Sequence, residues 1–160
     1  MDTEIESYSR LLQLIVKRLC ASLEGLSEAQ LNWRPPTDGA NSAYVIAAHT
    51  LGNARAWVLG IACGRPVERD RPAEFRASGH DATELTAQGQ QLSDDMVEGL
   101  ASLPPSALER RLVPPRSLWG EGEPWEISVR EALLHVMEHA SLHVGQLQIT
   151  RDLALREAKA

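Results

Sequence analysis

Four long stretches of the sequence repeat apolar residues at spacings of three and four, and each is bounded by glycine, proline or a polar turn. This period is typical of amphipathic helices. We predict helices near residues 3–24, 42–63, 82–103 and 128–155. Segments 65–81 and 104–127 separate the later helices and are rich in proline or charge. The pattern predicts an all-α protein, a four-helix bundle with two long connections.

Local signals support these boundaries. Ser27 can cap a short helical turn, and Asn41 or Ser42 can cap the second long helix, whose apolar residues on more than one face predict extensive burial. Ser128 and Glu131 form a capping-box pair at the start of the last helix. We expect 65–81 to be an exposed, aperiodic connection, although loops of about 17 residues are often functional. Residues 104–127 should form a loop or short strands.

Composition narrows the class of protein. The 160 residues fit a single domain spanning 1–160, and 43% of them are hydrophobic. No apolar run approaches the roughly 20 residues that cross a bilayer, and the acidic N-terminus does not resemble a secretory signal. The formal net charge of −6 disfavours binding to phosphate backbones. We expect a cytoplasmic protein that binds neither membrane nor nucleic acid.

The two cysteines are weak candidates for chemistry. Cys20 and Cys63 are far apart and form no C-x-x-C pair, which argues against a thiolate zinc site or a dithiol redox motif. Cys20 lies in an apolar stretch and is predicted to be buried and inert. Cys63, at the expected end of a helix, has no base beside it in the sequence that would mark it as reactive.

Three of the five histidines form a ladder in the sequence LLHVMEHASLHVGQ, at His135, His139 and His143. Residues four apart lie one helical turn above each other, so two neighbours can bind one ion. The rise across all three is about 12 Å, too long for metal–nitrogen bonds of about 2.1 Å to bridge. Two pairs therefore remain open, His135 with His139 or His139 with His143. The alternative is that these are partly buried histidines hydrogen-bonded to neighbours.

A metal site would need a further ligand from another helix. His49 lies in the apolar sequence VIAAHTLGNARAW, where an imidazole must find a partner. His80 lies beside glycine and aspartate in the sequence ASGHD, and we interpret it as a solvated loop histidine.

The sequence AYVIAAHTLGNARAWVLG, followed by LLHVMEHASLHVGQLQ, resembles the DinB-like family of metal-binding four-helix proteins, as does the early LSEAQLNWRPP. The resemblance implies that His49, His139 and His143 are the metal ligands, and it thereby chooses the second pair. His135 would then line the pocket one turn before the site. Asn53 and Trp57 are further candidate pocket residues. The family usually has arginine where this chain has Val144, and some relatives have glutamate at the position of His139.

The resemblance also implies a use for the site. Three neutral imidazoles leave the charge of a divalent ion, zinc or nickel, uncompensated, which favours an anionic further ligand. Characterised relatives include transferases and isomerases that depend on low-molecular-weight thiols. We therefore expect a small-molecule substrate. The resemblance, together with the apolar residues on more than one face of the second long helix, also predicts a homodimer. The alternatives are a metal-dependent hydrolase, with Glu138 as the nearest carboxylate in sequence, or a non-catalytic binding or scaffold protein. Four tryptophans could line a pocket or anchor the core: Trp33, Trp57, Trp119 and Trp125.

Overall fold

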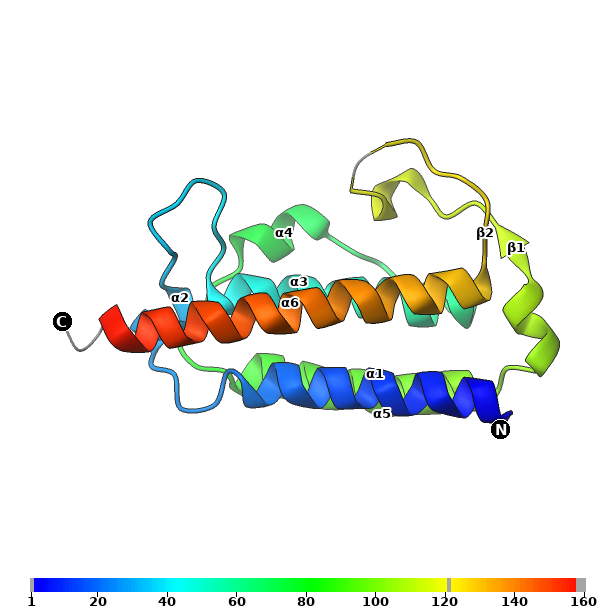
Figure 1. Ribbon diagram of the computed structural model, residues 1–160, viewed down its shortest axis with the longest axis horizontal. Coiled ribbons are helices and arrows are strands. Elements are labelled where there is room, and N and C mark those ends of the chain that lie inside the picture. The colour runs from blue at the N-terminus through cyan, green and yellow to red at the C-terminus, as the bar shows by residue number, and fades with distance from the viewer. Residues whose placement is uncertain (1, 121, 158–160) are drawn as a thin grey trace.

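The computed structural model describes residues 2–120 and 122–157, and helices make up most of it (Figure 1). Four helical segments are long, and their bounds agree with the prediction to within a few residues. They are α1 (Thr3–Ala21), α3 (Ala43–Ala54) continued by the π-helical η1 (Arg55–Ala62), α5 (Thr83–Ala101) and α6 (Val129–Glu157). The predicted all-α, four-helix architecture is confirmed.

The long helices pack as two layers, with α6 over α3 and α1 beside α5 (Figure 1). Helices α3 and α6 run in opposite directions, so the start of one faces the end of the other. His49 therefore lies against His143, and Trp57, two turns later on the α3–η1 segment, lies against His135. This antiparallel register brings the two histidine-containing segments of the sequence together.

The helix starts follow the predicted capping signals. The Ser42 hydroxyl accepts from the backbone N–H of Val45, and at the start of α6 the Ser128 hydroxyl accepts from the Glu131 N–H while the Glu131 carboxylate accepts from the Ser128 N–H. The short helix α2 (Glu28–Asn32) likewise begins at a capping box formed by Ser27. The expected N-terminal signals are therefore confirmed.

Helix α3 is the most buried of the long helices. Ten of its twelve residues are buried, as the apolar residues on several of its faces predicted. Among them are three polar residues: Thr50, whose hydroxyl donates to the Ile46 carbonyl, and His49 and Asn53, which are only 6% and 4% exposed. Buried polar groups are uncommon without a partner or a task, so α3 holds the first indication of a functional site.

The connection 104–127 contains the short elements that were expected. It holds the 3₁₀ turns η2 (Pro105–Glu109) and η3 (Arg116–Leu118), and strand β1 (Arg111–Leu112) pairs antiparallel with β2 (Ile127–Ser128). In Figure 1 this connection arches over one end of α6.

The connection 65–81 departs from its predicted aperiodic form, although its residues are exposed or half-buried, as expected of an exposed connection. It contains helix α4 (Arg71–Arg76), which begins where the Asp70 carboxylate accepts from the N–H of Ala73 and has Pro72 in its first turn. The helix lies along α3 (Figure 1) and brings Glu74 inward. The prediction of an aperiodic segment was wrong because a six-residue helix is too short to show periodicity.

The cysteines agree only in part with expectation. Cys20 is half-buried rather than buried, because it lies at the edge of the α1–α5 interface against Gly89. Cys63 is also half-buried, and burial raises the pKa of both thiols. Within the described residues, no helix is both long and apolar enough to cross a membrane.

Candidate metal centre

Three histidines from two helices converge on one point. His49 of α3 and His139 and His143 of α6 each offer a ring nitrogen, and these nitrogens lie within 4.8 Å of one another. The ring centroid of His49 is 5.2 Å from that of His139 and 5.1 Å from that of His143. The structure thus brings together the three residues that the family resemblance implied, and it places His135 outside the group.

The spacing of the nitrogens suits a small divalent ion. Two nitrogens bound to one tetrahedral zinc ion, with bonds of about 2.05 Å, lie about 3.3 Å apart. The Nε2 atoms of His49 and His139 are 3.4 Å apart. One pair of candidate ligands therefore already has the required separation, and the ring of His143 lies next to both.

Hydrogen bonds orient two of the three rings. The Nδ1–H of His49 donates to Glu74 Oε2 over 2.9 Å, and the Nδ1–H of His143 donates to Gln146 Oε1 over 2.9 Å. In each ring this leaves Nε2 with a free lone pair. A metal-binding histidine is commonly held in this way, with its other nitrogen donating to a carboxylate or carbonyl oxygen.

The site favours the neutral imidazoles of His139 and His143. Burial, followed by the nearby His143, His49, His135 and Arg69, lowers the pKa of His139 to about 3. Burial also lowers the pKa of His143, although its hydrogen bond to Gln146 acts in the opposite direction. Because only neutral imidazole binds metal, these pKa shifts favour the metal-binding form at neutral pH.

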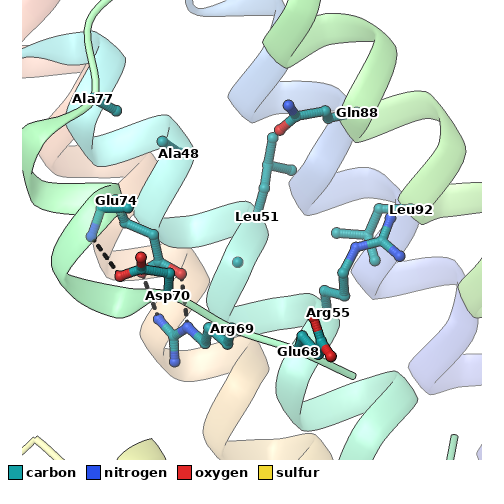
Figure 2. A pocket seen from close by; sticks show the side chains of 12 residues that line it. Ala48, Leu51, Arg55, Glu68, Arg69, Asp70, Glu74, Ala77, Gln88 and Leu92 are labelled. Atoms are coloured by element: carbon teal, nitrogen blue, oxygen red, sulfur yellow. Dashed lines mark hydrogen bonds and ion pairs between the residues drawn. The ribbon is translucent and has the colours of Figure 1, made fainter. Parts of the chain in front are cut away.

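Glu74 and Arg69, both in the 65–81 connection, complete the site behind His49. The guanidinium of Arg69 donates from Nε to Glu74 Oε1 over 2.7 Å and from Nη2 to Glu74 Oε2 over 2.8 Å. Figure 2 shows the two groups facing each other. They line a pocket of about 320 Å³ whose lining does not include the three histidines. Burial acts to raise the pKa of Glu74, but hydrogen bonds from His49 and Arg69 outweigh it and lower that pKa.

Sequence reasoning missed both residues. The available signal was local: Asp70 followed by Pro72 is typical of a helix start, so α4 itself could have been predicted. That α4 turns Glu74 toward His49 depends on tertiary packing, which the sequence of this segment does not encode by itself.

An aromatic cluster lies beside the histidines. The ring of His135 packs on that of Trp57, with centroids 4.5 Å apart, and Trp57 meets Trp119 edge to face at 5.9 Å. Trp119 contacts Trp125, which is 60% exposed. Trp33 lies at the end of α2 and, among the described rings, makes no contact with this cluster. Three of the four tryptophans therefore form one cluster of contacting rings next to His135.

Several buried polar atoms without a hydrogen-bond partner lie near the histidines and the aromatic cluster. In the described residues, six buried side-chain nitrogen or oxygen atoms lack a hydrogen-bond partner, and all but Arg151 Nε belong to residues at the histidines or the aromatic cluster. These five atoms are Asn53 Oδ1, Trp57 Nε1, Arg69 Nη1, Trp119 Nε1 and His139 Nδ1. Such atoms are rare in folded proteins, and their concentration here indicates a site shaped by function rather than by stability alone.

The remaining candidates lie away from the centre. Glu138 is exposed on the solvent face of α6. Val144 is a buried core residue, so this chain has an apolar side chain where the family usually has arginine. His80 is exposed, 3.0 Å from Glu28, which confirms it as a solvated loop histidine.

Comparison with known proteins agrees with this architecture. A conserved protein from Enterococcus faecalis, known from a crystal structure, has a similar fold, with a TM-score of 0.72 at 16% sequence identity over 97% of this chain and 98% of that one. No curated protein matches the sequence. A profile of the DinB superfamily matches residues 11–147. With most of its length covered by that profile, the chain belongs to the DinB superfamily.

Proposed function

We propose that this chain is a metal-dependent enzyme in which His49, His139 and His143 hold one divalent ion, zinc or nickel, and in which a low-molecular-weight thiol is activated to attack a small electrophile. The observation that carries the proposal is the convergence of three ring nitrogens within 4.8 Å. When bound, a divalent ion supplies positive charge that lowers the pKa of a thiol or water at its open position.

The charges of the surrounding residues favour an anionic partner such as a thiolate. The three imidazoles are neutral ligands, and the negative charge of Glu74 is matched by the guanidinium of Arg69, which is 2.7 Å away. The positive charge of Arg69 also reaches His139, whose pKa it helps to lower. The protein therefore contributes little net negative charge to offset that of a divalent ion.

One observation disfavours the hydrolase alternative, and another concerns the source of the thiol. A hydrolase would need a carboxylate base beside the open position, but both oxygens of Glu74 accept hydrogen bonds from His49 or Arg69, and Glu138 is exposed to solvent. The raised pKa values of Cys20 and Cys63 disfavour either as the nucleophile, which favours an added thiol.

The aromatic cluster suggests the kind of electrophile. Trp119 and the exposed Trp125 present ring surface beside the buried Trp57 and His135, and the indole N–H groups of Trp57 and Trp119 have no protein partner. Such a cluster suits a small molecule with a flat or apolar body and a few polar acceptors.

The test is a metal analysis of untagged protein, followed by a screen of low-molecular-weight thiols against generic electrophiles. We expect about one bound zinc or nickel ion per chain and thiol-dependent consumption of an electrophile that His143→Ala abolishes and Cys20→Ser leaves intact. Metal binding with no turnover would instead support the non-catalytic binding alternative. Failure of the wild-type protein to bind either ion would refute the proposal.

A further inference from the structure

The Glu74 carboxylate occupies one fixed place beside His49. Its Oε2 accepts from His49 Nδ1 and Arg69 Nη2, its Oε1 accepts from Arg69 Nε, and its side chain is only 11% exposed. A carboxylate held by a two-pronged guanidinium has little freedom to move aside. Whatever residue of α3 lies under Glu74 must therefore leave room for it.

Gly52 is that residue. A Cβ built on Gly52 would lie 2.8 Å from Glu74 Cδ and would overlap Oε1, whereas carbon atoms in contact are normally about 3.5 to 4.0 Å apart. Glycine is unfavourable inside a helix, and Gly52 is not among the glycines with positive φ, so its backbone conformation does not require glycine. The close approach of Glu74 is the remaining reason for it.

We propose that Gly52 is a positioning residue of the metal centre: its missing side chain admits the Glu74 carboxylate, which fixes the tautomer and orientation of His49. The proposal rests on the function proposed above and adds residues that act through His49 rather than on the ion. With Glu74 displaced, the His49 ring loses the acceptor that keeps its proton on Nδ1 and its lone pair on Nε2. Loss of such a partner typically weakens metal affinity by about 10- to 100-fold.

The experiment is a double-variant cycle on metal affinity. The zinc dissociation constant is measured, by competition with a chromophoric chelator, for the wild-type protein, Gly52→Ala, Glu74→Ala and the combined variant. Gly60→Ala is the matched control, because it lies on the continuation of the same helix and its added Cβ would meet Val67 at an ordinary 3.7 Å. The protonated ring nitrogen of His49 in metal-free protein, read by nitrogen NMR, provides a second readout that a general loss of packing would not produce.

We expect Gly52→Ala and Glu74→Ala each to weaken zinc binding by about 10- to 100-fold. The combined variant should bind like Glu74→Ala alone, because with no carboxylate to displace the added methyl has no effect. Gly60→Ala should bind like the wild-type protein. In Gly52→Ala the His49 proton should no longer be confined to Nδ1.

Three results would overturn the inference while leaving the metal centre itself intact: zinc affinity of Gly52→Ala equal to that of the wild-type protein, losses that multiply in the combined variant, or an unchanged His49 tautomer. If Gly52→Ala proves too unstable to titrate, the same cycle is read in melting temperature. The combined variant must then recover the stability of Glu74→Ala, and failure to recover it would also overturn the inference. Absence of zinc binding in the wild-type protein would refute the proposed function instead.

Discussion

The ring of Trp57 packs against that of His135, with centroids 4.5 Å apart, one turn before the proposed metal ligand His139. Trp57 is only 1% exposed, and it closes the α3–α6 interface beside the site. His135 is therefore held by packing, whereas His139 and His143 are turned toward His49. This contrast favours His139 with His143 over His135 with His139, the two candidate pairs that the spacing of the ladder left open.

The first prediction concerns the ladder. His139→Ala and His143→Ala each remove one of three ligands and should abolish tight zinc or nickel binding. His135→Ala should weaken binding by about 10- to 100-fold at most, because its ring only supports a ligand. Metal content of untagged protein measures the contrast. Loss of metal in His135→Ala with retention in His143→Ala would show that the other pair binds the ion.

The second prediction concerns Trp57. Replacing this buried indole with alanine should lower the free energy of unfolding by about 3 to 5 kcal/mol. Urea denaturation followed by circular dichroism measures the change. Trp125→Ala is the control: its side chain is 60% exposed, and we expect a change within about 0.5 kcal/mol. Equal effects of the two variants would contradict the role of Trp57 in the core.

The third prediction concerns pH. The folded protein holds the pKa of His139 at about 3 and lowers those of His135 and His143, so the unfolded chain, with histidine pKa values near 6.5, binds more protons in acid. The stability of metal-free protein should therefore be fully present above about pH 6.5 and fall as the pH drops toward 3, by at most about 1.4 kcal/mol per pH unit for each histidine.

The lowered pKa of Glu74 adds to this trend below its unfolded value of 4.5. Urea denaturation in the presence of a chelator at several pH values tests the trend, and His139→Gln should show a shallower slope. Stability that rises between pH 6.5 and 5 would contradict the prediction.

The fourth prediction concerns the 65–81 connection. Because Glu74 joins α4 to His49, metal binding at His49 should stabilise α4, as two linked equilibria require. Hydrogen exchange at Arg71–Arg76 should slow when zinc is added, whereas the α5 amides serve as the control. His49→Ala should remove the effect. Equal slowing in α5 would indicate general stabilisation rather than this link.

The fifth prediction is the homodimer. The apolar residues of α3 that suggested it lie mostly in the chain's own core, but α6 exposes Leu134, Leu142, Ile149 and Leu153 by 40% to 65%. Apolar residues gathered on one exposed helix face often mark an interface. Light scattering at micromolar concentration should give twice the 17.6 kDa chain mass, and Ile149→Glu should give the monomer. Leu11→Glu on α1 is the control, and a monomeric wild-type protein would refute the prediction.

The long helices could be predicted because their determinants are local. Periodicity identified them, and caps such as Ser42 and Ser128 placed their starts. The π-helical turns at Arg55–Ala62 could not be predicted, because a bond such as that from the Cys63 N–H to the Val58 carbonyl depends on a hydrogen-bond register without a distinct residue pattern.

Only the part of the site that forms a recognisable sequence motif, its histidines, could be predicted. Spacing alone allowed His139 to pair with either neighbour, and only the register of α3 against α6, or the family resemblance, chooses His143. The contribution of Glu74 depends on how a short helix packs against Gly52, and no pattern in either segment shows that contact.

The two helices that supply the histidines belong to opposite halves of the chain, and 90 positions separate His49 from His139. The centre is therefore complete only after a loop of that length has closed. Metal capture would report that closure, and a bound ion would act as a reversible crosslink between the first and last thirds of the polypeptide.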